Sequence, residues 1–166
     1  MKKIHFFLKM DKIPTITAQQ KGERVLNGKI VHYDKKEVKE AKELFLRRLR
    51  PYIPEEQYYK GTPLSLSIIF YYPWNGRKKD TYTRYKVTRP DADNAAKILI
   101  DCMTKAGFWH DDSQIAIYHI EKKEVNLNYQ PKFKYEETGI DISIEPLEQQ
   151  EELEDGSLDI DTGYQE

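Results

Sequence analysis

The chain has 166 residues, of which 39% are hydrophobic, and its 27 basic and 28 acidic residues give a net charge of −1. That length suits a single domain with its own core, and the one cysteine, Cys102, excludes an intramolecular disulfide and is typical of a reducing compartment. The longest apolar run, LSLSIIFYY at 64–72, is too short to cross a bilayer, and MKKIHFFLKMDK at the start lacks the apolar core of a signal peptide, so we expect a cytoplasmic protein without a membrane segment.

The charge is unevenly distributed along the chain. Residues 147–166 contain eight acids and no lysine or arginine, so residues 1–146 hold 27 basic and 20 acidic residues. We therefore divide the chain into a basic folded domain, 1–146, and an acidic tail, 147–166. The composition of the tail is typical of a disordered segment. A second interpretation, a tail that folds over a basic groove and competes with nucleic acid, stays open.

In the first half of the chain the pattern predicts a strand, a hairpin, a helix and a second strand. KIHFFLKM (3–10) has an apolar centre between charges, and GERVLNGKIVHY (22–33) places Asn-Gly, a favoured hairpin turn, between two strand-like runs. A helical apolar period starts at Asp34, a candidate cap, and ends before Pro51. LSLSIIFYY, which Pro73 ends, is expected to be a central strand.

The second half begins with PWNGRKKDTYTRYKVTR (73–89), a polar and aromatic loop that is long for a compact domain, a kind of loop that often carries function. A helix is predicted over about 93–106, with Gly107 as its stop. Strands follow at about 114–125 and in GIDISIEP (139–146). This order predicts an α+β domain in which two helices pack on one mixed sheet, with an additional N-terminal hairpin.

The loop at 73–89 is strongly basic, with a single acid, Asp80. Lysine and arginine side chains neutralise the phosphates of a nucleic-acid backbone. We predict that six residues of this loop bind DNA, namely Arg77, Lys78, Lys79, Arg84, Lys86 and Arg89.

Five aspartates surround the second predicted helix. Asp91 and Asp93 stand at its start, Asp101 in its middle, and Asp111 and Asp112 after its end. Carboxylates this close repel one another unless something neutralises them or keeps them hydrated. Each of them has an ordinary structural interpretation, because aspartates commonly cap helices and occupy turns.

The joint pattern favours a metal site. Asp93, Lys97 and Asp101 share one helix face, and Mg²⁺ is bound by carboxylate, water and phosphate oxygens. A metal there would polarise a phosphoryl oxygen, and Lys97 would stabilise the developing charge. A helix of about 14 residues is about 21 Å long. Whether Asp112 reaches Asp93 therefore depends on how the following connection folds, which the sequence leaves open.

Two other kinds of metal site fail on inspection. A calcium-binding EF-hand loop starting at Asp91 would need oxygen ligands and a glycine where the chain has Ala95, Ala96 and Cys102. Zinc is not expected, because the four histidines are scattered and Cys102 belongs to the apolar stripe of the helix.

Two blocks, RPDADNAAK (89–97) and AGFWHDDSQI (106–115), together resemble the signature of the RusA family of Holliday junction resolvases. That signature has Asp-x-Asp-Asn with a lysine four residues after the second aspartate, then Gly-Phe-Trp and an Asp-Asp pair. Either block alone would be weak, and their correct spacing makes the resemblance specific. The order of predicted elements extends the resemblance to residues 1–146.

The resemblance implies a Mg²⁺-dependent endonuclease that acts as a homodimer on four-way DNA junctions in recombination and repair. The sequence itself leaves the preference between Mg²⁺ and Mn²⁺ open. It implies that Asp91, Asp93 and Asp112 bind the metal and that Lys97 is the essential cation of the catalytic set. It also implies that the second acidic block folds back to the first. No membrane partner and no small-molecule cofactor beyond the metal are expected.

Two alternative functions remain open. The chain could be a resolvase-derived dimer that holds branched DNA without cutting it, or a nuclease for another branched structure. The complete set of acids and lysine favours the resolvase, since a site that had lost its activity would be expected to lose a carboxylate. The role of the segment TITAQQKG (15–22) and of the hairpin that it leads into stays open as well.

Overall fold

The computed structural model describes residues 2–16, 21–74, 83–129, 134–135 and 137–148. Its strands and helices are, in order, β1 (Ile4–Lys9), β2 (Lys21–Leu26), β3 (Lys29–Asp34), α1 (Lys36–Leu49), β4 (Leu64–Pro73), β5 (Thr83–Tyr85), α2 (Ala92–Ala106), β6 (Ile115–Val125) and β7 (Gly139–Pro146). Three short 3-10 turns are η1 (Arg50–Tyr52), η2 (Asp112–Gln114) and η3 (Leu127–Tyr129). Within the described residues no helix is long and apolar enough to cross a membrane. Most of the acidic tail, 149–166, lies outside them.

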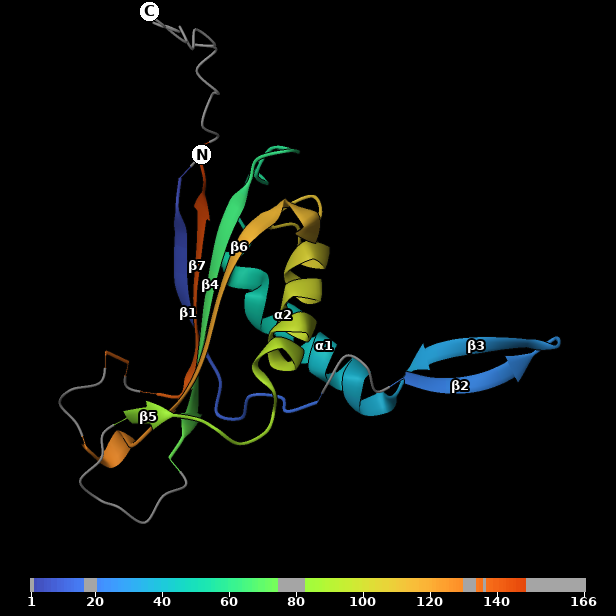
Figure 1. Cartoon of the computed structure of the whole chain (residues 1–166), viewed down its shortest axis with the longest axis horizontal. Coiled ribbons are helices and arrows are strands. Elements are labelled where there is room, and N and C mark those ends of the chain that lie inside the picture. Colours follow the sequence, from blue (N-terminus) through green and yellow to red (C-terminus); the bar gives the residue numbers. More distant parts are fainter. Residues whose placement is uncertain (1, 17–20, 75–82, 130–133, 136, 149–166) are drawn as a thin grey trace, which may run out of the picture.

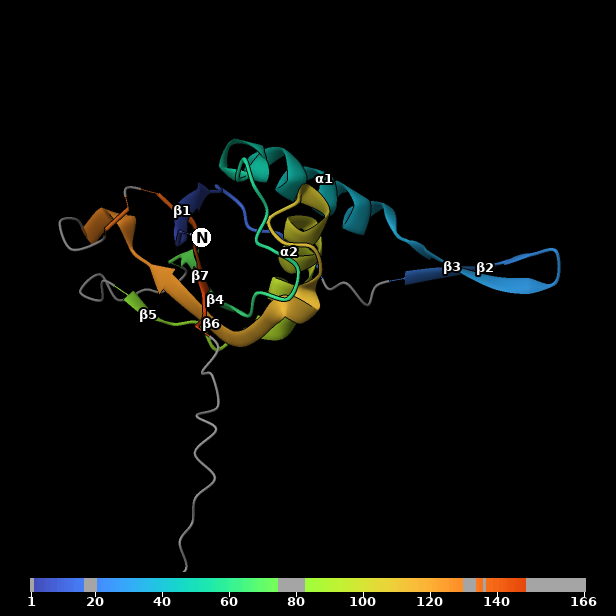
Figure 2. The same cartoon turned by 90° about the horizontal axis from the view of Figure 1, so that it is seen from above.

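Five strands form one sheet in the order β1-β7-β4-β6-β5, and β2 pairs with β3 in a separate hairpin. β4 and β6 run parallel, while the other neighbours in the sheet are antiparallel. Both helices cover the same face of the sheet (Figures 1 and 2). The α+β domain with two helices on a mixed sheet, predicted from the sequence, is confirmed.

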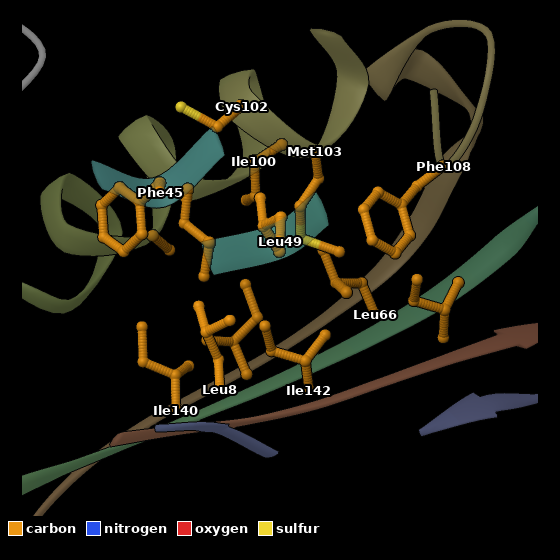
Figure 3. Packing of buried hydrophobic residues seen from close by; sticks show 14 of the residues in the cluster. Leu8, Phe45, Leu49, Leu66, Ile100, Cys102, Met103, Phe108, Ile140 and Ile142 are labelled. Carbon is orange, nitrogen blue, oxygen red and sulfur yellow. The ribbon is translucent and has the colours of Figure 1, made fainter. Parts of the chain in front are cut away.

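The core lies between this sheet face and the two helices (Figure 3). On the central strand β4 the side chains alternate between buried and half-buried, as the two-residue period of a strand requires. The buried ones are Leu64, Leu66, Ile68, Phe70 and Tyr72. The helices contribute apolar stripes at helical spacing, which are Val38, Ala41, Phe45 and Leu49 of α1 and Ile98, Leu99, Cys102 and Met103 of α2.

Helix α1 ends at Leu49, before Pro51, as predicted, but its start differs from the prediction. Its N-cap is Lys35, which has no side-chain capping hydrogen bond. Asp34 does not cap the helix. Its carboxylate instead accepts a hydrogen bond from Lys42 Nζ at 2.7 Å, which ties the end of β3 to the helix.

Helix α2 stops at Gly107, which has a φ of 92°, a left-handed conformation that favours glycine. Phe108 and Trp109 follow, and both are fully buried. Trp109 Nε1 donates a hydrogen bond to Thr104 Oγ1 at 2.7 Å. The Gly-Phe-Trp part of the sequence signature therefore turns the chain and fixes it to the core.

The loop at 73–89 is not structureless. Thr83–Tyr85 form β5, a short strand that pairs antiparallel with Lys123–Val125 of β6, so the prediction of an irregular loop was wrong at this point. Residues 75–82 lie outside the described part of the chain. Pairing with β6 draws the second half of the loop toward the N-terminal end of α2, as Figure 1 shows.

The predicted hairpin is confirmed. Asn27 and Gly28 have φ angles of 51° and 75°, and positive angles at both positions are what a two-residue type I′ turn needs. Leu26 pairs with Lys29 across the turn. The hairpin extends away from the sheet and helices in both views (Figures 1 and 2).

Candidate functional site

Asp91 and Asp93 lie at the N-terminal end of α2, where Asp91 is the N-cap and Asp93 is in the first turn. Both side chains are exposed. Asp91 makes no capping hydrogen bond to the helix backbone, and its Oδ2 accepts one from Asn94 Nδ2 at 3.4 Å. The positive end of the helix dipole favours negative charge at this place. Both carboxylates are therefore stabilised at the N-terminal end of the helix while they face solvent.

Lys122 on β6 fixes the loop that leads into this acid pair. Its Nζ donates hydrogen bonds to the backbone oxygens of Thr88, at 3.0 Å, and of Pro90. Side chains alternate along a strand, and Ile120, two residues earlier, packs against the core. Lys122 thus lies on the helix-facing side of the sheet. Because Asp91 follows Pro90 directly, Lys122 joins the strand to the residue that begins the acid pair.

The ammonium group of Lys122 also affects the local electrostatics. Partial burial lowers its pKa, and the neighbouring ammonium of Lys86 lowers it further, while the carboxylates of Asp91 and Asp93 oppose both effects. A cation held this close reduces the repulsion between the two carboxylates. The structure therefore contains a counter-charge for the first acidic block.

Glu124 lies two residues further along the same face of β6 and is only 4% exposed. It pairs with Arg84 Nη2 at 2.6 Å and with Lys86 Nζ at 3.3 Å. Burial opposes ionisation of this carboxyl, but the hydrogen bonds from Arg84 and Lys86 outweigh that effect and lower the pKa of Glu124. This buried ion pair holds β5 and the residues after it against β6.

The six basic residues predicted to bind DNA occupy different environments. Arg84 and Lys86 are engaged by Glu124 of their own chain, whereas Arg89 is exposed. Three of the six, Arg77, Lys78 and Lys79, lie outside the described residues. The role of all six in DNA binding stays a prediction. In the structure, Arg84 and Lys86 also stabilise the loop by pairing with Glu124.

Lys97 lies one helical turn beyond Asp93, with 59% of its side chain exposed. Its Nζ is 3.9 Å from Asp101 Oδ1, a loose surface ion pair of the kind worth about 0–1 kcal/mol. Such a contact is weak enough to be exchanged for a phosphate. Asp101, which the sequence placed on the same helix face, thus has a partner within the helix.

The second acidic block lies at the opposite end of α2. Asp111 has a structural role, because its Oδ1 accepts a hydrogen bond from Ser113 N at 3.0 Å and closes a capping box with Gln114. This hydrogen bonding lowers the pKa of Asp111. Asp112 is partly buried, and its backbone oxygen accepts a hydrogen bond from Tyr118 Oη at 3.4 Å.

Within one chain the two acidic blocks do not meet. The 15 residues of α2 separate them, and a helix of that size is about 22 Å long. Figure 1 shows the start of β6 and the start of α2 at opposite ends of the helix. Among the described residues no three histidine, cysteine, aspartate or glutamate side chains are grouped so that they could hold a metal ion. The implied convergence of Asp112 with Asp91 and Asp93 is therefore absent from a single copy.

Comparison with known proteins identifies the family. A family model described as endodeoxyribonuclease RusA matches residues 13–145. The chain belongs to the RusA family. It is 38% identical over 124 residues to the crossover junction endodeoxyribonuclease rusA of Lactococcus phage r1t, which is 75% of this chain and 89% of that protein. It is also 49% identical over 37 residues to crossover junction endodeoxyribonuclease RusA of Escherichia coli K12, which is 22% of this chain and 31% of that protein.

The sequence analysis of this RusA-family chain missed Lys122 and Glu124. Both lie on β6 in the same alternation as Ile120, so they occupy helix-facing positions where a strand of the core would have apolar residues. Charged residues in that register are costly to bury unless they are paired. That pattern in IEKKEV (120–125) was a usable signal that other residues of the site pack against this end of the strand.

We expect Lys122→Met to loosen the loop before Asp91, because the substitution removes both hydrogen bonds from Nζ and keeps an apolar stem. Loss of about 1.4 kcal/mol from these contacts would speed amide hydrogen exchange of residues 86–89 about tenfold. Mass spectrometry of the corresponding peptide measures this. Lys123→Met is the matched control, since Lys123 pairs with Glu121 at 2.6 Å on the other side of the strand. Equal exchange in both variants would contradict the role assigned to Lys122.

Glu124→Gln should destabilise the RusA fold in a pH-dependent way. The pKa of Glu124 is lowered from 4.5 in the folded protein, so its ionised form contributes stability above pH 4.5 that is lost as the pH falls through the folded-state pKa. The difference in unfolding free energy between wild type and variant should be about 1–3 kcal/mol at pH 7 and shrink in acid. Urea unfolding at several pH values measures it, with the exposed Glu55→Gln as control. A pH-independent difference would show that packing alone is affected.

Proposed function

We propose that this protein is a Mg²⁺-dependent endodeoxyribonuclease that resolves four-way DNA junctions by hydrolysing one phosphodiester bond in each of two strands. One observation carries the proposal. Asp91 and Asp93 form an exposed carboxylate pair that a helix N-terminus and a partly buried lysine hold in place. The relatives of this chain are named crossover junction endodeoxyribonucleases, and the acid pair is the feature of the structure that suits such chemistry.

The donor set fits magnesium. Mg²⁺ is bound through one or two carboxylates together with waters and substrate phosphate oxygens, and Asp91 and Asp93 offer two exposed carboxylates at one place. When bound, the ion would supply Lewis-acid polarisation of the phosphodiester and an activated water. Mn²⁺ has similar oxygen-ligand preferences and is a reasonable substitute.

The other residues of the site position and balance charge. Lys97, on the same helix one turn away, would hold a non-bridging phosphate oxygen once its loose pair with Asp101 opens. Arg89, exposed next to the acid pair in sequence, would contact the DNA backbone. Lys122 keeps the acid pair in position and does not need to touch the substrate.

The position of Asp112 favours a site shared between two copies. In the described part of the chain, β5 covers β6 only at Lys123–Val125, so the earlier part of β6 has an open edge. Ile117 and Tyr118 on that part are 50% and 47% exposed. Open strand edges readily pair with another strand. Antiparallel pairing of two copies about Tyr118 would place Asp112 of each near the Lys122 end of the other copy's β6, beside its acid pair.

The first experiment uses a synthetic four-way junction with each strand labelled in turn. The protein should cut two opposed strands with Mg²⁺ and none with EDTA, and Asp93→Asn should reduce the rate at least about 100-fold. Asp101→Asn is the matched control, because Asp101 is on the same helix outside the proposed ligand set. Its rate should stay within about threefold of wild type. Tight junction binding without cleavage in Mg²⁺ or Mn²⁺ would instead favour a non-cleaving branched-DNA-binding protein.

The shared site makes a separate prediction about mixed dimers. Asp93→Asn and Asp112→Asn should each be inactive alone. A mixed dimer has one site that combines an intact Asp93 from one copy with an intact Asp112 from the other, so co-expression of the two variants should restore nicking of one strand per junction. If Asp112 served the acid pair of its own chain, both sites of the mixed dimer would be damaged and no activity would return. Strand-specific labels distinguish the two results.

A further inference from the structure

The hairpin of β2 and β3, residues 21–34, is a separate structural unit that we call the arm. It extends away from the body in Figures 1 and 2, and no other described element lies beside its outer half in either view. Near its turn the large apolar side chains are exposed, with Val25 at 72%, Ile30 at 64% and Leu26 at 52%. An exposed apolar tip on a projecting unit indicates a site that binds a partner.

The structure of the arm also indicates that it binds a partner. A two-stranded hairpin alone is marginally stable in water, and in the described chain neither outer edge of the arm pairs with another strand. Its base is stiffened, because the Tyr33 ring occupies the space that a Cβ at Gly22 would need, 2.5 Å from the ring carbon. Six-residue strands reach about 20 Å. The arm is thus a projecting ribbon whose outer half is without a described partner.

The charge of the arm and its base distinguishes between possible partners. Residues 21–39 hold six basic and three acidic residues. This excess of three positive charges favours a polyanion as the partner of the arm, and nucleic acid is such a polyanion. The width of a two-stranded ribbon also matches a DNA groove.

We infer that the arm enters the branch point of the four-way junction, where its apolar tip contacts bases that lack a full stacking neighbour. This inference rests on the proposed function and names the part of the protein that recognises branching. Apolar side chains used as wedges, such as leucine and isoleucine, are known to insert between base steps. Val25, Leu26 and Ile30 provide the wedge, and Lys29, the first residue of β3 after the turn, provides a cation for an adjacent phosphate. A linear duplex offers no such opening, so the arm contributes to junction selectivity.

The test measures binding in the Asp93→Asn background, so that it does not depend on cleavage. Leu26→Ser with Ile30→Ser should weaken binding to a four-way junction at least tenfold, and change binding to a linear duplex of the same sequence by less than threefold. A 2-aminopurine base at the branch point should brighten with the parent protein and stay dark with the arm variant. Ile53→Ser, on the body and 38% exposed, is the control and should behave like the parent. Unchanged junction affinity and unchanged fluorescence would overturn the inference.

A second measurement keeps the three apolar side chains of the tip unchanged. Cys102 is buried, and burial raises the pKa of its thiol to about 11, so a cysteine introduced by Lys29→Cys is the reactive thiol for a photo-crosslinker. Crosslinks should fall on nucleotides next to the branch point. Crosslinks to a second protein chain, or a halved molecular mass of the arm variant in light scattering, would overturn the inference and make the arm a contact between copies. Absence of cleavage by the unmodified protein would refute the proposed function. The affinity and crosslinking results would still decide whether the arm contacts the branch point.

Discussion

The candidate site depends on charged groups placed on the core-facing side of β6. Lys122 and Glu124 replace the apolar residues that this register would otherwise have, and each is satisfied by groups from the loop at 83–90. Without these partners a buried charge costs several kcal/mol, roughly enough to offset much of the stability of a small domain. The loop therefore cannot move away freely from the strand. The attachment of this loop to Lys122 and Glu124 also fixes the position of Asp91 and Asp93, because the loop ends at Asp91.

Helix α2 imposes a second constraint, because it keeps the two acidic blocks apart. Its apolar stripe is packed in the core along its whole length, and Gly107, Phe108 and Trp109 anchor its far end. Moving Asp112 to Asp93 within one chain would require this packing to break. In the proposed dimer, a second copy would supply Asp112 without any such change, by pairing along the open edge of β6. The packing of α2 is therefore the reason for proposing a dimer.

Much of the architecture was predictable from local pattern, while the arrangement of the site was not. The Asn27-Gly28 turn, the alternating β4 and the Gly107 stop depend on residues close in sequence, and all three were predicted correctly. β5 was missed because three residues in a polar loop carry little periodicity, and Asp34 was misplaced because Lys42 competes for its carboxylate. Lys122 and Pro90 are 32 positions apart, so the hydrogen bond between them depends on the tertiary fold. The sequence signature identified the residues and could not give their distances.

A shared site would also explain how a nuclease with a basic folded domain avoids damaging ordinary DNA. The excess of basic residues in 1–146 would attract the domain to any duplex, since neutralising phosphates depends little on sequence. A single copy on such a duplex holds only Asp91 and Asp93 at one place, which is part of the proposed ligand set. Completion of the proposed set would then require two copies, and two copies that share their sites would face two strands at once. Cleavage would be coupled to assembly, and paired nicks, which resolve a junction, would be favoured over the isolated nicks that only damage it.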